Sequence, residues 1–355
     1  MTETVSQLLL DWYDAHRREM PWRVLPEDGK RGVRADPYRV WLSEIMLQQT
    51  TVATVRAYFE KFTTLWPSLP DLAAASEDDV LKAWAGLGYY SRARNLKKCA
   101  DTVMAEHGGA FPQTRDGLQS LPGIGAYTSA AIASIAFNQP EAVVDGNVER
   151  VFTRLFAIET PLPQAKAIVA AHVQELLDMD RPGDFAQATM DLGATLCTPK
   201  NPACLHCPLR NHCRALDGDP QRFPVKAAKK AKPLRKGAVF IAQDATGAVL
   251  LEKRPPTGLL ASMAQPPTTG WTSRIDGATG TDAAPFTADW QQAGTVRHVF
   301  THFELDLTVW FASIGKISLK DGQWLSASPD NEALPTVMKK AIGCALPDAF
   351  KGTKP

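Results

Sequence analysis

The segment Leu121–Asn147, LPGIGAYTSAAIASIAFNQPEAVVDGN, constrains the fold of this chain more than any other stretch. Gly123 and Gly125 predict a tight turn at which the backbone can approach another group closely. A helix is expected to begin near Tyr127, and the free amides at its N-terminus would form a seat for an anion such as a phosphate. A lone Gly-x-Gly more often marks an ordinary turn between core helices, so the neighbouring motifs must decide.

Length and composition predict a soluble protein of about two domains. The chain has 355 residues, of which 45% are hydrophobic and 22% charged, and its net charge is +1. Such a small charge does not indicate a general polyanion binder, so local basic patches must carry any contact with nucleic acid. Residues 1–20 lack the basic lead and long apolar run of a signal peptide, and 127–137 is too short to cross a bilayer. We expect a cytoplasmic (nucleoid) protein without membrane contact.

Four of the six cysteines lie in one short segment, CTPKNPACLHCPLRNHC. Their spacing is Cys197-x6-Cys204-x2-Cys207-x5-Cys213. Structural disulfides are not expected in a reducing compartment, so four thiolates in one loop predict a metal site, either tetrahedral zinc or an iron-sulfur cluster. Generic zinc sites usually contain two Cys-x2-Cys pairs, and this segment contains one.

Two carboxylates are candidates for acid-base chemistry. An N-cap followed by proline at 36–37 predicts a helix over 37–62 that carries Glu44 and Gln48 on one face. Apolar neighbours would raise the pKa of Glu44, as a general acid requires, although a glutamate taken alone is more often a solvated helix residue. Asp145 opens the next predicted helix, where an aspartate most often serves only as an N-cap.

Two basic segments are candidates for contact with DNA. In 86–100, GLGYYSRARNLKKCA, a glycine turn with two tyrosines precedes a helix that carries Arg92, Arg94, Lys97 and Lys98. This pattern suits a surface that follows a nucleic-acid backbone, or a solvated basic helix face. Residues 222–236 contain seven Lys or Arg and no acidic residue, which predicts an exposed linker.

Beyond the linker the pattern changes to strands. The segments 237–243 and 247–254 alternate around a turn at Asp244–Gly247 and predict a hairpin. Farther on, Phe303, Leu305, Leu307 and Val309 share one face of another predicted strand, and 335–346 closes the domain as a helix.

These motifs together resemble a known family of DNA-repair enzymes. LPGIGAYTSAAI resembles the helix-hairpin-helix of base-excision DNA glycosylases, and VVDGNVERV resembles the segment with their essential aspartate. The cysteine spacing is similar to the 4Fe-4S loop of endonuclease III-like glycosylases, and the C-terminal part resembles the Nudix-like domain of adenine DNA glycosylases. The implied fold is an all-α helix-hairpin-helix glycosylase domain, with two helical lobes and an iron-sulfur loop, followed by an α+β Nudix-like domain.

The resemblance also implies domain boundaries. The helical domain is expected at 1–216, the basic linker at 217–236 and the Nudix-like domain at 237–355. No glutamate occurs between Glu252 and Glu304, so the magnesium-binding signature of a Nudix hydrolase is missing. The C-terminal domain should therefore not hydrolyse a diphosphate, and the resemblance implies that it recognises 8-oxoguanine instead.

The activity implied is that of a monomeric base-excision-repair glycosylase. It would flip adenine mispaired with 8-oxoguanine or guanine out of double-stranded DNA and remove it by hydrolysis. Glu44 would be the general acid and Asp145 the carboxylate that stabilises or covalently traps the oxocarbenium ion, with Tyr127 and Asn147 in support. Lyase-active relatives carry a lysine nucleophile where this chain has Tyr127, so a monofunctional enzyme is expected.

The resemblance further assigns contacts with DNA and with the cluster. The DNA-contacting residues would be Arg23, Gln48, Gln49, Thr50, Leu87, Tyr89, Gly123, Gly125, Phe300, Thr301 and His302, and the 4Fe-4S ligands Cys197, Cys204, Cys207 and Cys213. Gln49 would enter the gap left by the flipped base, and 300–302 would sense 8-oxoguanine, with Thr301 where the family usually has serine. Two alternatives remain open, namely a lyase-active glycosylase for oxidised pyrimidines and a non-catalytic DNA-binding protein.

Overall fold

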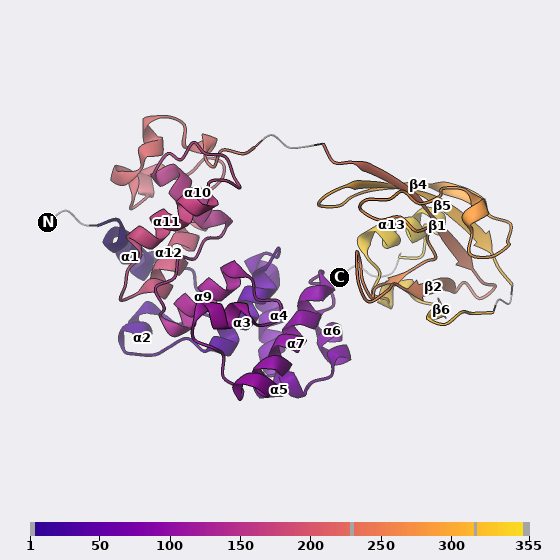
Figure 1. The fold of residues 1–355 in the computed structure, drawn as a ribbon, viewed down its shortest axis with the longest axis horizontal. Coiled ribbons are helices and arrows are strands. Elements are labelled where there is room, and N and C mark those ends of the chain that lie inside the picture. Colours follow the sequence, from indigo (N-terminus) through magenta and orange to yellow (C-terminus); the bar gives the residue numbers. More distant parts are fainter. Residues whose placement is uncertain (1–3, 228–230, 316–317, 351–355) are drawn as a thin grey trace. The chain divides into compact units, whose positions relative to one another are not determined.

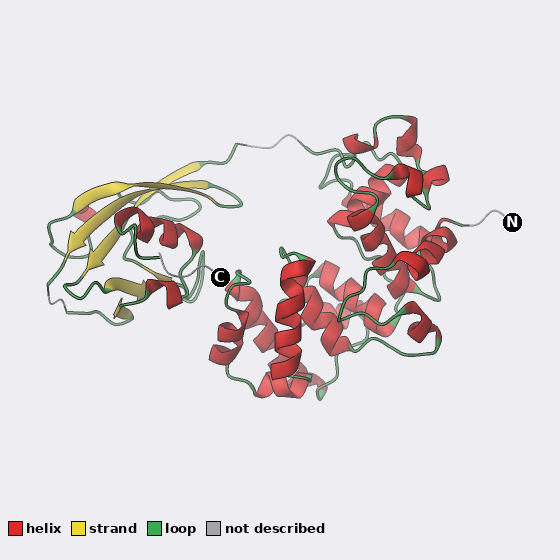
Figure 2. Cartoon of the chain, turned by 180° about the vertical axis from the view of Figure 1, so that it is seen from behind, coloured by secondary structure: helices red, strands yellow, loops and turns green. Residues whose placement is uncertain are grey.

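The computed structural model describes residues 4–227, 231–315 and 318–350, which fall into two compact units, Met1–Ala228 and Lys229–Pro355 (Figure 1). The first unit is built of helices and the second around a sheet (Figure 2). This confirms the predicted change from helices to strands across the basic segment.

The helical unit contains α1 to α12. Their bounds are α1 Val5–His16, α2 Pro26–Lys30, α3 Pro37–Leu47, α4 Val52–Leu65, α5 Leu69–Ala74, α6 Glu77–Trp84, α7 Tyr90–His107, α8 Arg115–Gln119, α9 Ala126–Phe137, α10 Gly146–Leu155, α11 Lys166–Leu176 and α12 Pro182–Thr195. Side chains that accept a backbone amide begin many of them, including Asp36 before α3, as the sequence predicted, and Thr114 before α8.

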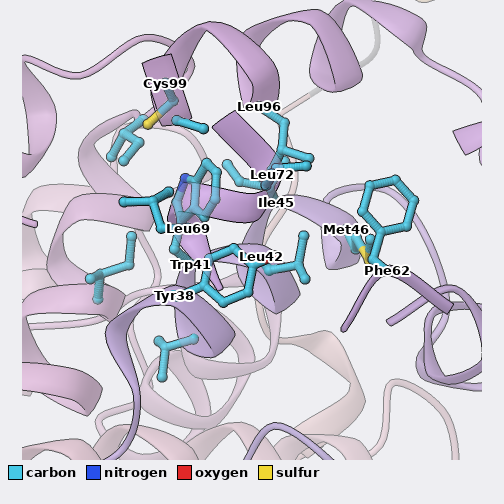
Figure 3. Packing of buried hydrophobic residues seen from close by; sticks show 14 of the residues in the cluster. Tyr38, Trp41, Leu42, Ile45, Met46, Phe62, Leu69, Leu72, Leu96 and Cys99 are labelled. Atoms are coloured by element: carbon cyan, nitrogen blue, oxygen red, sulfur yellow. The ribbon is translucent and has the colours of Figure 1, made fainter. Parts of the chain in front are cut away.

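Two hydrophobic cores divide this unit into two lobes. The first core takes side chains from α3 to α9, and Figure 3 shows Trp41 of α3 among Leu69, Leu72 and Cys99 of α5 and α7. The second takes side chains from α1 and α9 to α12. Helix α9 is apolar on every side and is buried in both cores, with Ile132 in the first and Ala131 in the second.

The helix predicted over 37–62 is interrupted. Helix α3 ends at Leu47 and α4 begins at Val52, because Thr51 caps α4 and Gln49 adopts a left-handed conformation with φ of +58°. Hydrophobic periodicity continues across the break and therefore did not reveal it. Residues 21–35, which precede α3, contain the short helix α2.

The two glycines of the α8–α9 hairpin have different structural roles. Gly123 has φ of +77°, and a Cβ atom there would lie 2.7 Å from Cβ of Asn95 in α7. Gly125 is the N-cap of α9 with φ of −92°, and a Cβ atom there would meet nothing within 4 Å. Only Gly123 is thus required by its backbone conformation and by its neighbour in the protein.

The C-terminal unit is a mixed sheet with one helix against it. Its strands are β1 Leu234–Gln243, β2 Val249–Lys253, β3 Ala264–Gln265, β4 Gln291–Val299, β5 Glu304–Ser313 and β6 Gln323–Ser326, and its helix is α13 Thr336–Ala345. The order is β3-β2-β1-β5-β4 with β6 beside β2; β1 and β5 are parallel and the other pairs antiparallel. The predicted β1–β2 hairpin is confirmed by the pairing of Gln243 with Val249.

Helix α13 packs against β1, β4 and β5 (Figure 1). The predicted apolar face of β5 is confirmed, since Leu305, Leu307 and Val309 are fully buried in the core that α13 completes. A smaller cluster that includes Phe286 and Trp290 covers the opposite face near Ala242 and Ala312.

Replacing Gly123 by alanine should destabilise the helical unit by about 1–3 kcal/mol, because the new methyl group meets Asn95 and the left-handed backbone is strained. The matched change Gly125→Ala should alter stability by less than about 0.5 kcal/mol. Denaturant unfolding followed by far-ultraviolet circular dichroism measures both. Equal losses in the two variants would contradict the distinction between the glycines.

Candidate active site

A cavity of about 270 Å³ in the helical unit brings together predicted residues from four separate segments. Its lining includes Arg23, Glu44, Gln48, Thr50, Tyr127, Asp145 and Asn147. Helix α3 supplies Glu44, α9 supplies Tyr127, and the start of α10 supplies Asp145 and Asn147. The proposed acid and the proposed stabilising carboxylate therefore line the same cavity.

Glu44 is buried, with 7% of its surface exposed, and is not the solvated residue that an isolated glutamate would predict. Burial raises the pKa of Glu44 to about 7; a hydrogen bond with Tyr127 and the positive charge of Arg23 lower it, and the negative charge of Asp145 raises it. The carboxyl group is thus protonated in a large fraction of molecules near neutral pH, and it can donate a proton.

Tyr127 remains a neutral phenol at this site. Burial raises the pKa of Tyr127 well above its ordinary value, and the charges of Glu44 and Asp145 act in the same direction. Its hydroxyl group can therefore hold the Glu44 carboxyl group through a hydrogen bond without competing for its proton.

Asp145 is the N-cap of α10 and also lines the cavity. Its Oδ1 accepts hydrogen bonds from the amides of Asn147, at 2.9 Å, and Val148, at 2.8 Å, while its Oδ2 accepts one from the side-chain amide of Asn147 at 2.9 Å. These donors and the positive end of α10 stabilise a carboxylate. The sequence left open whether Asp145 is only an N-cap or also a group of the site. The structure shows that one side chain can cap α10 and line the cavity at the same time.

Asn147 is held in turn by Arg150. The Arg150 guanidinium donates to Oδ1 of Asn147 at 2.8 Å, to the carbonyl of Gly193 at 2.7 Å and to the carbonyl of Cys197 at 2.7 Å. Helix α12 also approaches closely here, because a Cβ atom on Gly193 would lie 2.7 Å from Cβ of Asn147. The orientation of the Asn147 amide is thus fixed by packing and by hydrogen bonds.

The cysteine segment follows α12 and suits an iron-sulfur cluster by its donor set. Cys197, Cys204, Cys207 and Cys213 are partly buried free thiols, and short 3-10 turns such as Cys204–His206 fold the loop. Burial raises the pKa of Cys207 to about 12, and the charges of the other three cysteines add to this effect, so the four sulfurs act on one another. Four thiolates are the ligands that a 4Fe-4S cluster takes.

Arg154 anchors this loop from α10. Its guanidinium is 2% exposed and donates to Sγ of Cys197 at 3.3 Å and to the carbonyls of Thr198 and Pro220 at 2.8 Å.

Among the described residues, no group of three or more His, Cys, Asp or Glu side chains has the arrangement of a site for a metal ion.

Arg23 was predicted to contact DNA, and the structure places its side chain in the protein interior. Both terminal nitrogens donate to the buried carboxylate of Asp191, at 2.8 and 2.9 Å, and Arg18 donates to the same carboxylate at 2.7 Å. Burial raises the pKa of Asp191, but the hydrogen bonds and charges of Arg23 and Arg18 outweigh this and lower it overall. Sequence reasoning missed Asp191 because it lies 168 positions from Arg23 in an apolar helix.

The other DNA-contacting candidates of the helical unit lie in turns. Gln49 is exposed in the α3–α4 turn, and Tyr89 is 61% exposed before α7, whereas Leu87 is buried at 6% exposure. The basic face predicted on α7 is smaller than the sequence suggested. Arg92 points inward to backbone carbonyls, and Lys97 pairs with Asp101 and donates to the carbonyl of Ala73.

Phe300, Thr301 and His302 form the turn between β4 and β5 of the C-terminal unit. Thr301 and His302 are exposed, while the Phe300 ring stacks on Phe303 with centroids 4.6 Å apart. The Phe300 carbonyl accepts a hydrogen bond from Nζ of Lys232 at 2.7 Å. The turn thus exposes the polar side chains of Thr301 and His302, while the stacked Phe300 ring holds the turn in place.

None of the helices in the described segments is both long and apolar enough to span a bilayer.

Three parts of the chain match known protein families. Residues 42–179 match the HhH-GPD superfamily of base excision DNA repair proteins, 197–213 the iron-sulfur binding domain of endonuclease III, and 238–343 the NUDIX domain. The predicted fold of both domains is confirmed, and so is the choice of an iron-sulfur cluster over zinc.

Other proteins are similar to this chain over most of its length. Adenine DNA glycosylase of Rattus norvegicus is 38% identical over 94% of this chain and 76% of that protein. Adenine DNA glycosylase of Homo sapiens is 41% identical over 74% of this chain, a match that spans 57% of the human protein. Among solved structures, a thermostable thymine-DNA glycosylase is 30% identical with a TM-score of 0.53, over 60% of this chain and 94% of that one.

Replacing Asp191 by asparagine should destabilise the helical unit by about 3–5 kcal/mol, because Arg23 would keep its charge in the interior without a carboxylate partner. The control is Asp78→Asn, which breaks the exposed pair of Asp78 with Lys82 and should have little effect. Thermal unfolding of the full chain compares the two. A small effect of Asp191→Asn would show that the Arg18–Arg23–Asp191 group does not stabilise the cavity wall.

Proposed function

The chain belongs to the adenine DNA glycosylases, and we propose that it hydrolytically removes adenine paired with 8-oxoguanine or guanine in duplex DNA, without lyase activity. The observation that carries this proposal is the cavity in which Glu44, with a pKa of about 7, and Asp145 lie together. One carboxyl group there can donate a proton, and the other is fixed by hydrogen bonds where it can face the sugar, and acid-assisted glycosidic cleavage uses two carboxyl groups in these roles.

Glu44 is the proposed general acid. Adenine is a poor leaving group until its ring nitrogen N7 accepts a proton, which Glu44 would donate. The bond between C1′ and N9 then breaks, its electron pair leaves with the base, and the sugar becomes an oxocarbenium ion. Tyr127 would hold the Glu44 carboxyl group in place throughout.

Asp145 is the proposed partner of the oxocarbenium ion, either as a counter-charge or as a nucleophile at C1′. Two backbone amides fix its Oδ1, and the Asn147 amide fixes its Oδ2, so no reorganisation is needed as positive charge develops on the sugar. A water molecule then adds to C1′ and returns a proton to Glu44, which completes hydrolysis.

Hydrolysis without a Schiff base is supported by the same cavity. Among the described residues that line it there is no lysine, and Tyr127 stands where lyase-active relatives have that nucleophile. Gln48 and Arg23 offer further hydrogen-bond donors to an extruded base. Their position in the lining favours contact with adenine over contact with the DNA backbone.

Recognition of the duplex is assigned to surfaces outside the cavity. Flipping a base costs a few kcal/mol of stacking, and the exposed Gln49, with Thr50, Leu87 and Tyr89 nearby, would fill the gap and contact the opposite base. The amides at Gly123 and Gly125 would bind a phosphate. Cys197, Cys204, Cys207 and Cys213 would hold the cluster, which supplies a rigid fold for the loop after α12.

The C-terminal part would recognise 8-oxoguanine. We assign 1–216 to the glycosylase domain, 217–236 to a basic linker and 237–355 to a Nudix-like recognition domain, in which Phe300, Thr301 and His302 contact the damaged base. The enzyme is proposed to act as a monomer on DNA of the nucleoid in the cytoplasm.

The general-acid role is tested by Glu44→Gln, with the exposed Glu60→Gln as the control. Loss of the acid should slow adenine release by about 10²–10⁴-fold in single-turnover assays, while affinity for the mispaired duplex is retained. Glu60→Gln should behave as the wild type. Unchanged release in Glu44→Gln would remove Glu44 from the mechanism, and an imine trapped efficiently by borohydride in the wild type would replace hydrolysis by lyase chemistry.

The pH dependence provides an independent test. Glu44 acts as an acid only when protonated, so kcat/KM should fall as the pH rises through about 7. Tyr127→Phe removes a hydrogen bond that lowers the pKa of Glu44, so its falling limb should move to higher pH even if the rate is reduced. Tyr38→Phe, whose hydroxyl bonds the Trp66 carbonyl away from the cavity, should leave the limb unmoved. A limb at the same pH in all three proteins would rule out Glu44 as the titrating acid.

A further inference from the structure

Two turns of the helical unit share an unusual backbone conformation. The first turn, residues 48–50, joins α3 to α4, and the second turn, residues 86–89, joins α6 to α7; the four helices lie side by side in Figure 1. Gln49 in the first turn has φ of +58°, and Tyr89 in the second has φ of +50°. Side chains other than glycine adopt this conformation only where the surroundings hold it. The two turns therefore need a support.

Arg92, in the first helical turn of α7, contacts both turns with one half-buried guanidinium. One terminal nitrogen donates to the carbonyls of Ile45 at 3.1 Å, Met46 at 3.2 Å and Gln48, at the end of α3. The other donates to Oγ1 of Thr50 at 3.3 Å, in the first turn, and to the carbonyl of Leu87 at 3.3 Å, in the second.

Aromatic rings fix the plane of the same guanidinium. Its central carbon lies 5.3 Å from the ring centroid of Tyr89 and 5.4 Å from that of Trp84. The indole nitrogen of Trp84 also donates to the carbonyl of Gly88 at 3.0 Å, which ties the second turn to the same aromatic side chain. Stacking and forked hydrogen bonds together determine where the second turn lies relative to the first.

The chemistry of these contacts indicates a geometric role. All five hydrogen-bond acceptors of Arg92 are neutral oxygens, and its positive charge lies at the C-terminal end of α3, where the helix dipole favours a cation. Helix α3 also carries Glu44. The Arg92 guanidinium therefore links the C-terminal end of that helix to both the first turn and the second turn.

We propose that Arg92 is a positioning residue that sets the spacing of the two turns, and through it the orientation of Gln49 and Tyr89 against the opened duplex. The proposal rests on the proposed function, since it assumes that these turns open a mispair. It assigns to Arg92 a part in base extrusion and not in proton transfer.

Lysine at this position would keep the positive charge but lose the paired hydrogen bonds of the guanidinium. A single ammonium group cannot reach the acceptors of both turns as the two terminal nitrogens of arginine do. Arg92→Lys therefore removes the link between the turns and retains the cation. Arg39→Lys is the matched control, because the Arg39 guanidinium also lies over an aromatic ring, 5.1 Å from the centroid of Phe59, and donates to the carbonyl of Pro21 at 3.0 Å, both of which lie outside the two turns.

The experiment compares single-turnover adenine release from two duplexes. In one, adenine opposite 8-oxoguanine lies in a fully paired sequence; in the other, mismatches on both sides already unstack it. Arg92→Lys should lose roughly 10- to 100-fold on the paired duplex and less than about threefold on the unstacked one, since extrusion costs little there. Arg39→Lys should match the wild type on both, and Arg92→Gln serves as a second variant if Arg92→Lys does not fold.

Equal losses on the two duplexes, or no loss on either, would overturn the positioning role, because a general structural defect does not depend on how the adenine is stacked. Adenine release by the wild type is the separate readout of the proposed function. If the wild type releases none, that function fails before Arg92 is tested.

Discussion

The burial of the Glu44 carboxyl group beside a second carboxyl group is the interaction on which the rest of the helical unit depends. A buried glutamate is costly unless it is neutral or paired, and here burial between α3, α9 and α10 raises the pKa of Glu44 to about 7, so that the neutral form is populated near physiological pH. Another part of the cavity wall is the N-terminus of α10, where the amides of Asn147 and Val148 hold the Asp145 side chain in place.

The sequence predicted those parts of the site that depend on local patterns. The cap before α3, the glycine turn before α9 and the aspartate that opens α10 follow from residue type and spacing over a few positions. The alternation along β5 likewise predicted which side chains are buried. The iron-sulfur site was identified by a spacing specific enough to resemble a single family of loops.

What the sequence did not reveal are interactions between distant segments. Asp191 and Arg154 are buried polar residues in helices, and nothing near them in the chain shows that one meets Arg23 and the other the cysteine loop. The break between α3 and α4 was missed for a related reason. It is stabilised by Arg92, forty-four positions from Gln48, and not by a glycine or proline in the turn itself.

Helix α9 has a consequence for how the helical unit comes apart. Because it contributes side chains to both cores, neither lobe can lose its packing without exposing apolar surface of the other. The two lobes are therefore expected to melt in a single cooperative transition, as one foldon and not as two. A thermal fluctuation that moves the two lobes apart must bend or shift α9. The helix that carries Tyr127 therefore also resists hinge motion between the lobes.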